Sequence, residues 1–131
     1  MTVSEEAILK VLRIARDHSR VGTGESLRDL LGKSGYATLR ASLTSSDIKG
    51  VLASHPELAL DWASFSEDKR TSGGYALVRN GPKWGIYGRH PDGSPLENPT
   101  FDDLESACAE YVLLELDFWT QLGSKPPHRA A

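Results

Sequence analysis

The sequence predicts an α+β fold in which N-terminal helices precede a three-stranded antiparallel meander and a long C-terminal helix packs on the sheet. Three observations predict it. Apolar residues recur at helical spacing through residues 1–56, a period of two begins at Leu58, and helical spacing returns from about residue 102 to residue 122. At 131 residues, with 39% hydrophobic and 25% charged residues, the chain has the size and composition of one globular domain.

We therefore expect a single domain over residues 1–131 with three parts. Residues 1–56 form the helical part, residues 57–123 hold the strands and the C-terminal helix, and residues 124–131 form a flexible tail.

Polar residues that cap helices mark two helix starts in the first half. Thr2 with Glu5, and Thr44 with Asp47, each have the three-residue spacing of a cap in which side chains and backbone N–H groups bond reciprocally. Gly32 is predicted to end a short helix after a leucine-rich stretch. Because Lys-Ser follows Gly32, the segment resembles the end of a phosphate-binding loop, but position 27 lacks the required first glycine.

Three short strands are predicted over residues 58–63, 75–78 and 84–88. The first shows alternation of apolar residues, and the other two flank an Asn80-Gly81-Pro82 turn. A polar connection with paired glycines separates the first two strands, and three prolines make residues 90–99 a loop. Successive strands with short connections are typical of an antiparallel meander.

The predicted final helix carries more apolar surface than one face requires. Asp102 and Asp103 lie at its start, where the helix dipole favours negative charge. Leu113 and Leu116 project away from the side that would lie on the sheet, so we expect either the N-terminal helices or a partner to cover them. Glu115 falls on the apolar side of the helix. A carboxylate there either needs a hydrogen-bonding partner or must extend to the margin of the apolar side.

No recognisable pattern for catalysis, metal binding or a cofactor occurs. The histidines are scattered over four segments, no nucleophile motif surrounds a serine, and Cys108 is a lone cysteine in an apolar helical pattern. We therefore expect no cofactor and no small-molecule substrate, with an enzyme of unrecognised site as an alternative. The acidic start and the lack of a long apolar stretch predict a cytoplasmic protein without membrane contact.

Charge is unevenly distributed along the chain. Residues 91–131 hold eight acidic residues and two basic ones, with no lysine or arginine between Arg89 and Lys125. Such a stretch is either a solvated surface or a contact for a basic partner. The candidate partner-binding residues are six of these eight acids and two in the connection after the first predicted strand: Asp92, Glu97, Asp102, Asp103, Glu110, Asp117, Glu67 and Asp68.

The stretch SEDKRTSGGYALVRNGPKWGIYGR, followed by TFDDLESACAEY, resembles bacterial polymorphic-toxin immunity proteins, including those of contact-dependent inhibition systems. The resemblance covers about residues 58–119. It implies a protein that forms a one-to-one complex with a cognate toxin domain, often a nuclease, and blocks its active site or substrate surface. Toxins that act on nucleic acids are commonly basic, which suits an acidic partner. The resemblance carries over no individual binding residue.

A winged-helix DNA-binding regulator is the competing interpretation, because it shares the order of short helices followed by a hairpin. Residues 45–53 would then enter the major groove with Lys49, and Lys69, Arg70 and Lys83 would form the wing. An isoelectric point near 5.8 makes attraction to phosphates weak, so we expect a protein partner and no nucleic acid.

Overall fold

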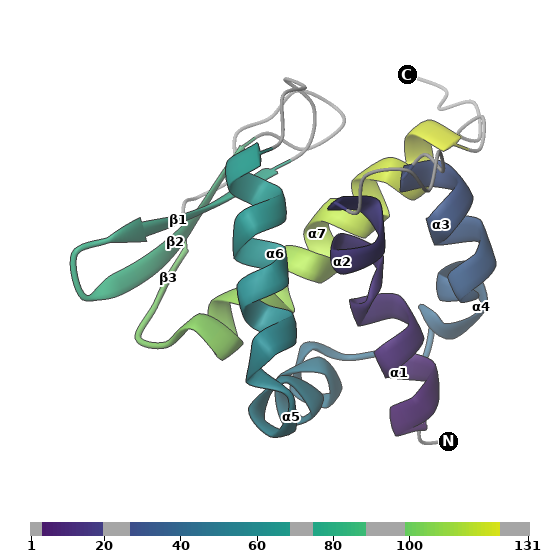
Figure 1. Cartoon of the computed structure of the whole chain (residues 1–131), viewed down its shortest axis with the longest axis horizontal. Helices are drawn as coiled ribbons and strands as arrows, with labels where there is room; N and C mark the ends of the chain where they lie inside the picture. The colour runs from purple at the N-terminus through teal and green to yellow at the C-terminus, as the bar shows by residue number, and fades with distance from the viewer. Residues whose placement is uncertain (1–3, 20–26, 69–74, 89–98, 124–131) are drawn as a thin grey trace.

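The computed structural model describes residues 4–19, 27–68, 75–88 and 99–123, and it has an α+β fold (Figure 1). The helices before the sheet are α1 (Glu5–Leu12), α2 (Ile14–Ser19), α3 (Leu27–Ser34), α4 (Tyr36–Leu39), α5 (Ser45–Ser54) and α6 (Pro56–Asp68). The strands β1 (Tyr75–Asn80), β2 (Lys83–Gly88) and β3 (Thr100–Phe101) are followed by the long helix α7 (Leu104–Gly123). The predicted order of helices, antiparallel sheet and C-terminal helix is confirmed.

The predicted cap at Thr44 is present. The Thr44 hydroxyl accepts a bond from the Asp47 N–H at 3.1 Å, and the Asp47 carboxylate accepts the Thr44 N–H at 3.2 Å. At α1 the side chain of Ser4 accepts the N–H of Ala7, while Thr2 lies outside the described residues. These caps satisfy backbone donors that have no partner in the first helical turn.

The predicted helix end at Gly32 is wrong by two residues. Helix α3 continues through Gly32 to Ser34, whose hydroxyl donates to the carbonyl of Leu31 at 2.7 Å. Gly35 follows with a φ of 78°, a left-handed conformation that glycine adopts without a steric penalty. The chain therefore turns at Gly35, and α4 begins directly after it.

The prediction of a strand over residues 58–63 is also wrong, because this segment belongs to α6. The helical part of the chain thus extends twelve residues past the predicted boundary, to Asp68. Leu58, Trp62 and Phe65 are buried while Leu60 is exposed, which is the spacing of a helix and not of a strand. Pro56 occupies the first helical position, where its missing N–H costs nothing, and so marks the start that the alternation of apolar residues concealed.

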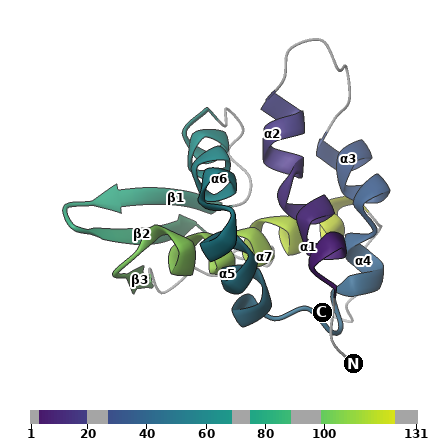
Figure 2. The same cartoon turned by 60° about the horizontal axis from the view of Figure 1, so that its bottom comes forward.

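The sheet has the order β1-β2-β3 with antiparallel neighbours. Strands β1 and β2 form a hairpin in which Asn80 pairs with Lys83 across a two-residue turn. Gly81 in this turn has a φ of 64°, as the first turn position of a tight hairpin of this kind requires. The third strand is Thr100–Phe101, which pairs with Trp84 and Gly85 of β2. In Figures 1 and 2 the hairpin extends away from the helices.

Helix α7 lies at the centre of the molecule (Figure 2). It contacts all three strands and also α3, α5 and α6. Leu113 is 8% exposed and Leu116 is fully buried, so of the two expected alternatives, cover by the N-terminal helices or by a partner, the structure shows the first. Trp62 of α6 joins the same core, since its ring packs edge-on against Tyr111 and its indole N–H donates to the carbonyl of Leu12 at 2.9 Å.

A buried carboxylate ties α7 to the sheet. Glu115 is fully buried, and its side chain accepts the backbone N–H of Tyr75 at 2.8 Å. Two residues further along β1, the Ser66 hydroxyl of α6 accepts the N–H of Leu77 at 2.7 Å and donates to its carbonyl at 3.3 Å. Two side chains from helices thus satisfy the edge of β1 that faces away from β2.

Replacing Glu115 tests how much the tie to Tyr75 stabilises the fold. Glu115→Leu leaves the Tyr75 N–H without its acceptor and should lower the free energy of unfolding by about 1–3 kcal/mol, whereas Glu115→Gln keeps an acceptor and should cost less. Urea denaturation of both variants measures the difference. Equal stability of the two variants would show that the hydrogen bond contributes nothing.

Candidate functional site

Asp117, one of the predicted partner-binding acids, forms hydrogen bonds and an ion pair with other residues of the same chain. The Tyr36 hydroxyl donates to its carboxylate at 2.6 Å, and the Arg40 Nε donates to both carboxylate oxygens at 2.9 and 3.0 Å. Arg40 also donates to the carbonyl of Leu43 at 3.1 Å, which anchors the guanidinium. Asp117 has no lysine or arginine near it in sequence, but an arginine distant in sequence reaches it in the fold.

The two acids at the start of α7 also have partners. Asp102 accepts a bond from the Lys83 Nζ of β2 at 2.9 Å. Asp103 caps α7 by accepting the N–H of Ser106 at 2.7 Å, and this bond is the main reason that its pKa lies below the ordinary aspartate value. The positive charge of Lys49 on α5 lowers the same pKa further. Both cations proposed for DNA contact within the described residues thus lie near acids.

The remaining predicted acids do not form one described surface. Glu110 is half-buried on α7 and Glu67 is exposed on α6. Asp92 and Glu97 lie outside the described residues, and so does the side chain of Asp68. Asp103 and Asp117 are separated by fourteen positions, or about 20 Å along the helix axis. The structure therefore brings together Asp102 and Asp103 and places Asp117 at a different part of the molecule.

The two ion pairs should differ in strength. The Arg40 and Asp117 side chains are 39% and 34% exposed, whereas Lys83 and Asp102 are 55% and 85% exposed. A double-mutant cycle with Arg40→Met and Asp117→Asn should give a coupling energy of about 0.5–1 kcal/mol, and the cycle with Lys83→Met and Asp102→Asn a value near zero. Equal coupling energies from urea denaturation would contradict this ranking.

Two buried tyrosines make the fold sensitive to alkali. Burial, reinforced by Asp117, raises the pKa of Tyr36, and burial, reinforced by Glu115, raises the pKa of Tyr111. The nearby Ser66 hydroxyl opposes the second shift without reversing it. Because the neutral phenol is favoured only in the folded state, the unfolded chain ionises first as the pH rises past about 10.

We therefore expect stability to be unaffected by these tyrosines below about pH 10 and to fall above it. In an alkaline titration, phenolate absorbance from two tyrosines should appear together with the loss of the helical circular dichroism signal. Tyr111→Phe should remove one of these late phenolates. Ionisation of every tyrosine while the helical signal persists would contradict the burial argument.

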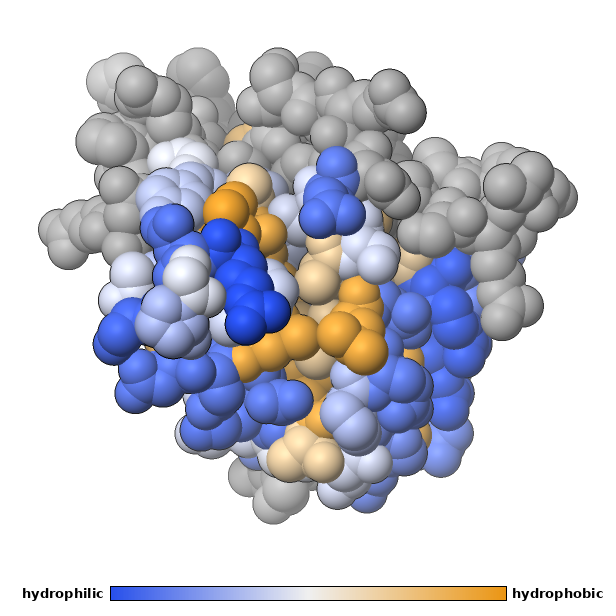
Figure 3. Space-filling view, turned by 60° about the vertical axis from the view of Figure 1, so that its left-hand side comes forward, coloured by the Kyte–Doolittle hydropathy of each residue, from blue (hydrophilic) through white to orange (hydrophobic). Residues whose placement is uncertain are grey.

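A groove between α6 and the hairpin is the main exposed apolar feature of the described surface. Leu60 of α6 is 60% exposed and Val78 of β1 is 40% exposed. Figure 3 shows apolar side chains gathered in a strip on this face, with hydrophilic side chains on both flanks. The groove has a volume of about 470 Å³ and is lined by Leu60, Ala63, Ser64, Ser66, Glu67, Ala76, Leu77, Val78, Arg79 and Trp84.

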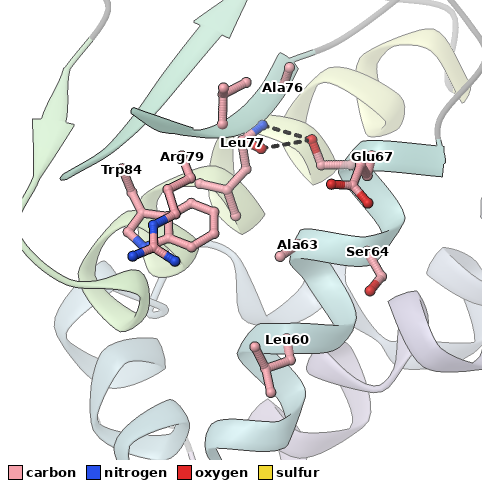
Figure 4. Close-up of a pocket in the computed structure, with 10 residues that line it drawn as sticks. Leu60, Ala63, Ser64, Glu67, Ala76, Leu77, Arg79 and Trp84 are labelled. Atoms are coloured by element: carbon pink, nitrogen blue, oxygen red, sulfur yellow. Dashed lines mark hydrogen bonds between the residues drawn. The ribbon is translucent and has the colours of Figure 1, made fainter. Parts of the chain in front are cut away.

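The groove is shaped as a wedge (Figure 4). Helix α6 and strand β1 are held together where Ser66 bonds Leu77, and from there they diverge towards Leu60 on one wall and Arg79 on the other. Trp84 of β2 pairs across the strands with Arg79 and points to the same side of the hairpin. An apolar strip with polar flanks and a tryptophan has the composition of a protein-binding surface.

The walls of the groove carry opposite charges. Glu67 lies on the α6 wall beside Ser66, where the helix and the strand are joined, and Arg79 lies on the hairpin wall at the open end (Figure 4). Glu67 is the one predicted partner-binding residue among those that line the groove. The sequence prediction missed Leu60 because the strand assignment placed that leucine beside Trp62 on one face, whereas the helix points Leu60 outwards and Trp62 into the core. The proline at position 56 was the signal that identifies the helix.

Other kinds of site find no support in the described part of the chain. No group of three side chains able to hold a metal ion occurs among those residues. Cys108 is fully buried, and burial raises the pKa of its thiol far above the ordinary value, which disfavours the reactive thiolate. Among the described helices, none combines the length and the apolar character needed to cross a membrane.

Comparison with known proteins gives no family or relative for this chain. It matches no protein-family description, and no similar curated protein or solved structure was found.

Proposed function

We propose that this chain is a binding protein whose groove between α6 and the hairpin contacts a partner protein, and that it acts as an immunity protein in the cytoplasm. In that role it binds one copy of a cognate toxin domain and covers the active site or substrate surface of the toxin. The observation that carries the binding role is the exposed apolar side chain of Leu60 in a groove that Ala63, Leu77 and Trp84 also line.

Exposure of large apolar side chains supports a contact surface because it is unfavourable in a protein that binds nothing. Trp84 is of the residue type that most often contributes a large share of binding energy at protein interfaces. The immunity role rests on the sequence resemblance over about residues 58–119, which includes the hairpin and all of α6 after Glu57. The two lines of support are independent of each other.

The acidic residues have a smaller part in this proposal than their number in the sequence indicates. Asp117 and Asp102 are paired with Arg40 and Lys83, so each pair is close to neutral. Charges of this kind contribute little direct binding energy, although the net charge of −3 still favours approach of a basic toxin. Glu67 is the predicted acid that lies in the groove itself.

Binding to the product of the neighbouring upstream gene tests the function. We expect a one-to-one complex, measurable by titration calorimetry, and protection of cells that express that product. Leu60→Glu should weaken the complex by about 2 kcal/mol, or roughly thirty-fold, because a charge would enter the apolar strip. Leu60 is already exposed, so the variant should fold normally.

Ala37→Glu is the matched control, since Ala37 is exposed on α4, far from the hairpin in Figure 1. It introduces the same charge and should leave the affinity unchanged. Equal weakening by both variants would mean that the added charge, and not the groove, controls binding. Absence of any complex, together with a gel shift of DNA at low salt, would favour the DNA-binding alternative over the immunity role.

A further inference from the structure

We infer that the groove binds an amphipathic helix of the partner protein, with basic side chains along the edge facing α6 and acidic side chains along the edge facing the hairpin. This inference rests on the proposed binding function and specifies the kind of segment that the partner presents. Three features of the groove lead to it: the occupied edge of β1, the wedge shape and the opposite charges of the walls.

The hydrogen bonds at the edge of β1 exclude an added strand. Successive residues of a strand direct their backbone groups alternately to the two sides, so Tyr75, Leu77 and Arg79 face away from β2. Glu115 already accepts the Tyr75 N–H, and Ser66 bonds both the N–H and the carbonyl of Leu77. Along this edge of the described strand, Tyr75–Asn80, this leaves the Arg79 position, which is too short for a strand to pair with.

The occupant must therefore bind through side chains, and the shape of the groove favours a helix. The small side chains of Ala63 and Ser64 lie on the α6 wall between Leu60 and Glu67, so a second helix can approach the α6 backbone closely. Leu60 and Trp84 flank the open side of the wedge, where the apolar stripe of an amphipathic helix would lie. The backbone groups of such a helix bond to one another within the helix, so it can bind without backbone hydrogen bonds to β1.

The charges of the walls set which helix binds. A carboxylate at Glu67 attracts lysine or arginine along one edge of the apolar stripe, and the guanidinium of Arg79 attracts glutamate or aspartate along the other. A helix with the two edges exchanged would place like charges together and would be rejected. Opposite charges on the two edges thus distinguish the expected segment from an ordinary apolar helix.

Selection from two displayed peptide libraries tests the inference without knowledge of the natural partner. One library presents peptides of about 18 residues, roughly five turns, on a helix-forming host with randomised positions on one face. The other presents extended strands of the same randomised composition. We expect the full chain to select helical peptides with an apolar stripe, basic residues on one edge and acidic residues on the other.

Variants of the chain show whether the selected peptides occupy the groove. Leu60→Glu should weaken a selected helix at least about ten-fold, and Ala37→Glu should leave its affinity unchanged. The double variant Glu67→Arg with Arg79→Glu exchanges the charges of the walls and should select peptides with the edges reversed. This reversal is a result that loss of folding cannot produce.

Three outcomes would overturn the inference: selection of strands only, helices whose binding is insensitive to Leu60→Glu, or no selected peptide from either library. A charge-exchanged variant that selects the same edges as the original chain would overturn the assignment of charges. Selected helices that bind the groove, together with no binding of the upstream gene product, would leave the inference standing and contradict only the immunity function.

Discussion

The buried carboxylate of Glu115 is the constraint on which the arrangement of sheet and helices depends. A carboxylate removed from water needs hydrogen-bond donors, and the backbone N–H of Tyr75 supplies one at 2.8 Å. This bond sets the start of β1 against the middle of α7, so the hairpin emerges at one defined place. Because α7 also contacts α3, α5 and α6, the same helix places the hairpin relative to the N-terminal half.

The bond between Ser66 and Leu77 has two consequences for function. It satisfies backbone groups at the edge of the sheet, which protects that edge from pairing with another strand. It also joins α6 to β1 at one point and lets them diverge beyond it, and the apolar groove lies in the space between them. Ser66 thus protects part of the edge, together with Glu115 at Tyr75, and also shapes the groove, which is left to partners that bind by side chains.

Local sequence was sufficient for features that depend on neighbouring residues. The capping pair at Thr44 and Asp47 and the hairpin turn at Gly81 could be predicted, because each follows from spacing within one helical turn or one tight turn. The spacing also indicated that Leu113 and Leu116 need a cover, but only the fold shows that other helices of the chain supply it. The alternation at 58–63 misled because five or six residues fit a strand and a helix almost equally well, and contacts with α2, β1 and α7 favoured the helix.

The α+β class, the order of the elements and the concentration of acids in the last third of the chain are properties of sequence spacing and composition, and they needed no coordinates. The partners of those acids, the outward position of Leu60 and the groove itself are properties of the folded molecule. Arg40 and Asp117 are 77 positions apart, and Ser66 and Leu77 belong to different elements, so no local pattern reports either pair. Long-range packing brings them together, and it is this packing that makes one stretch of surface apolar and neutralises another.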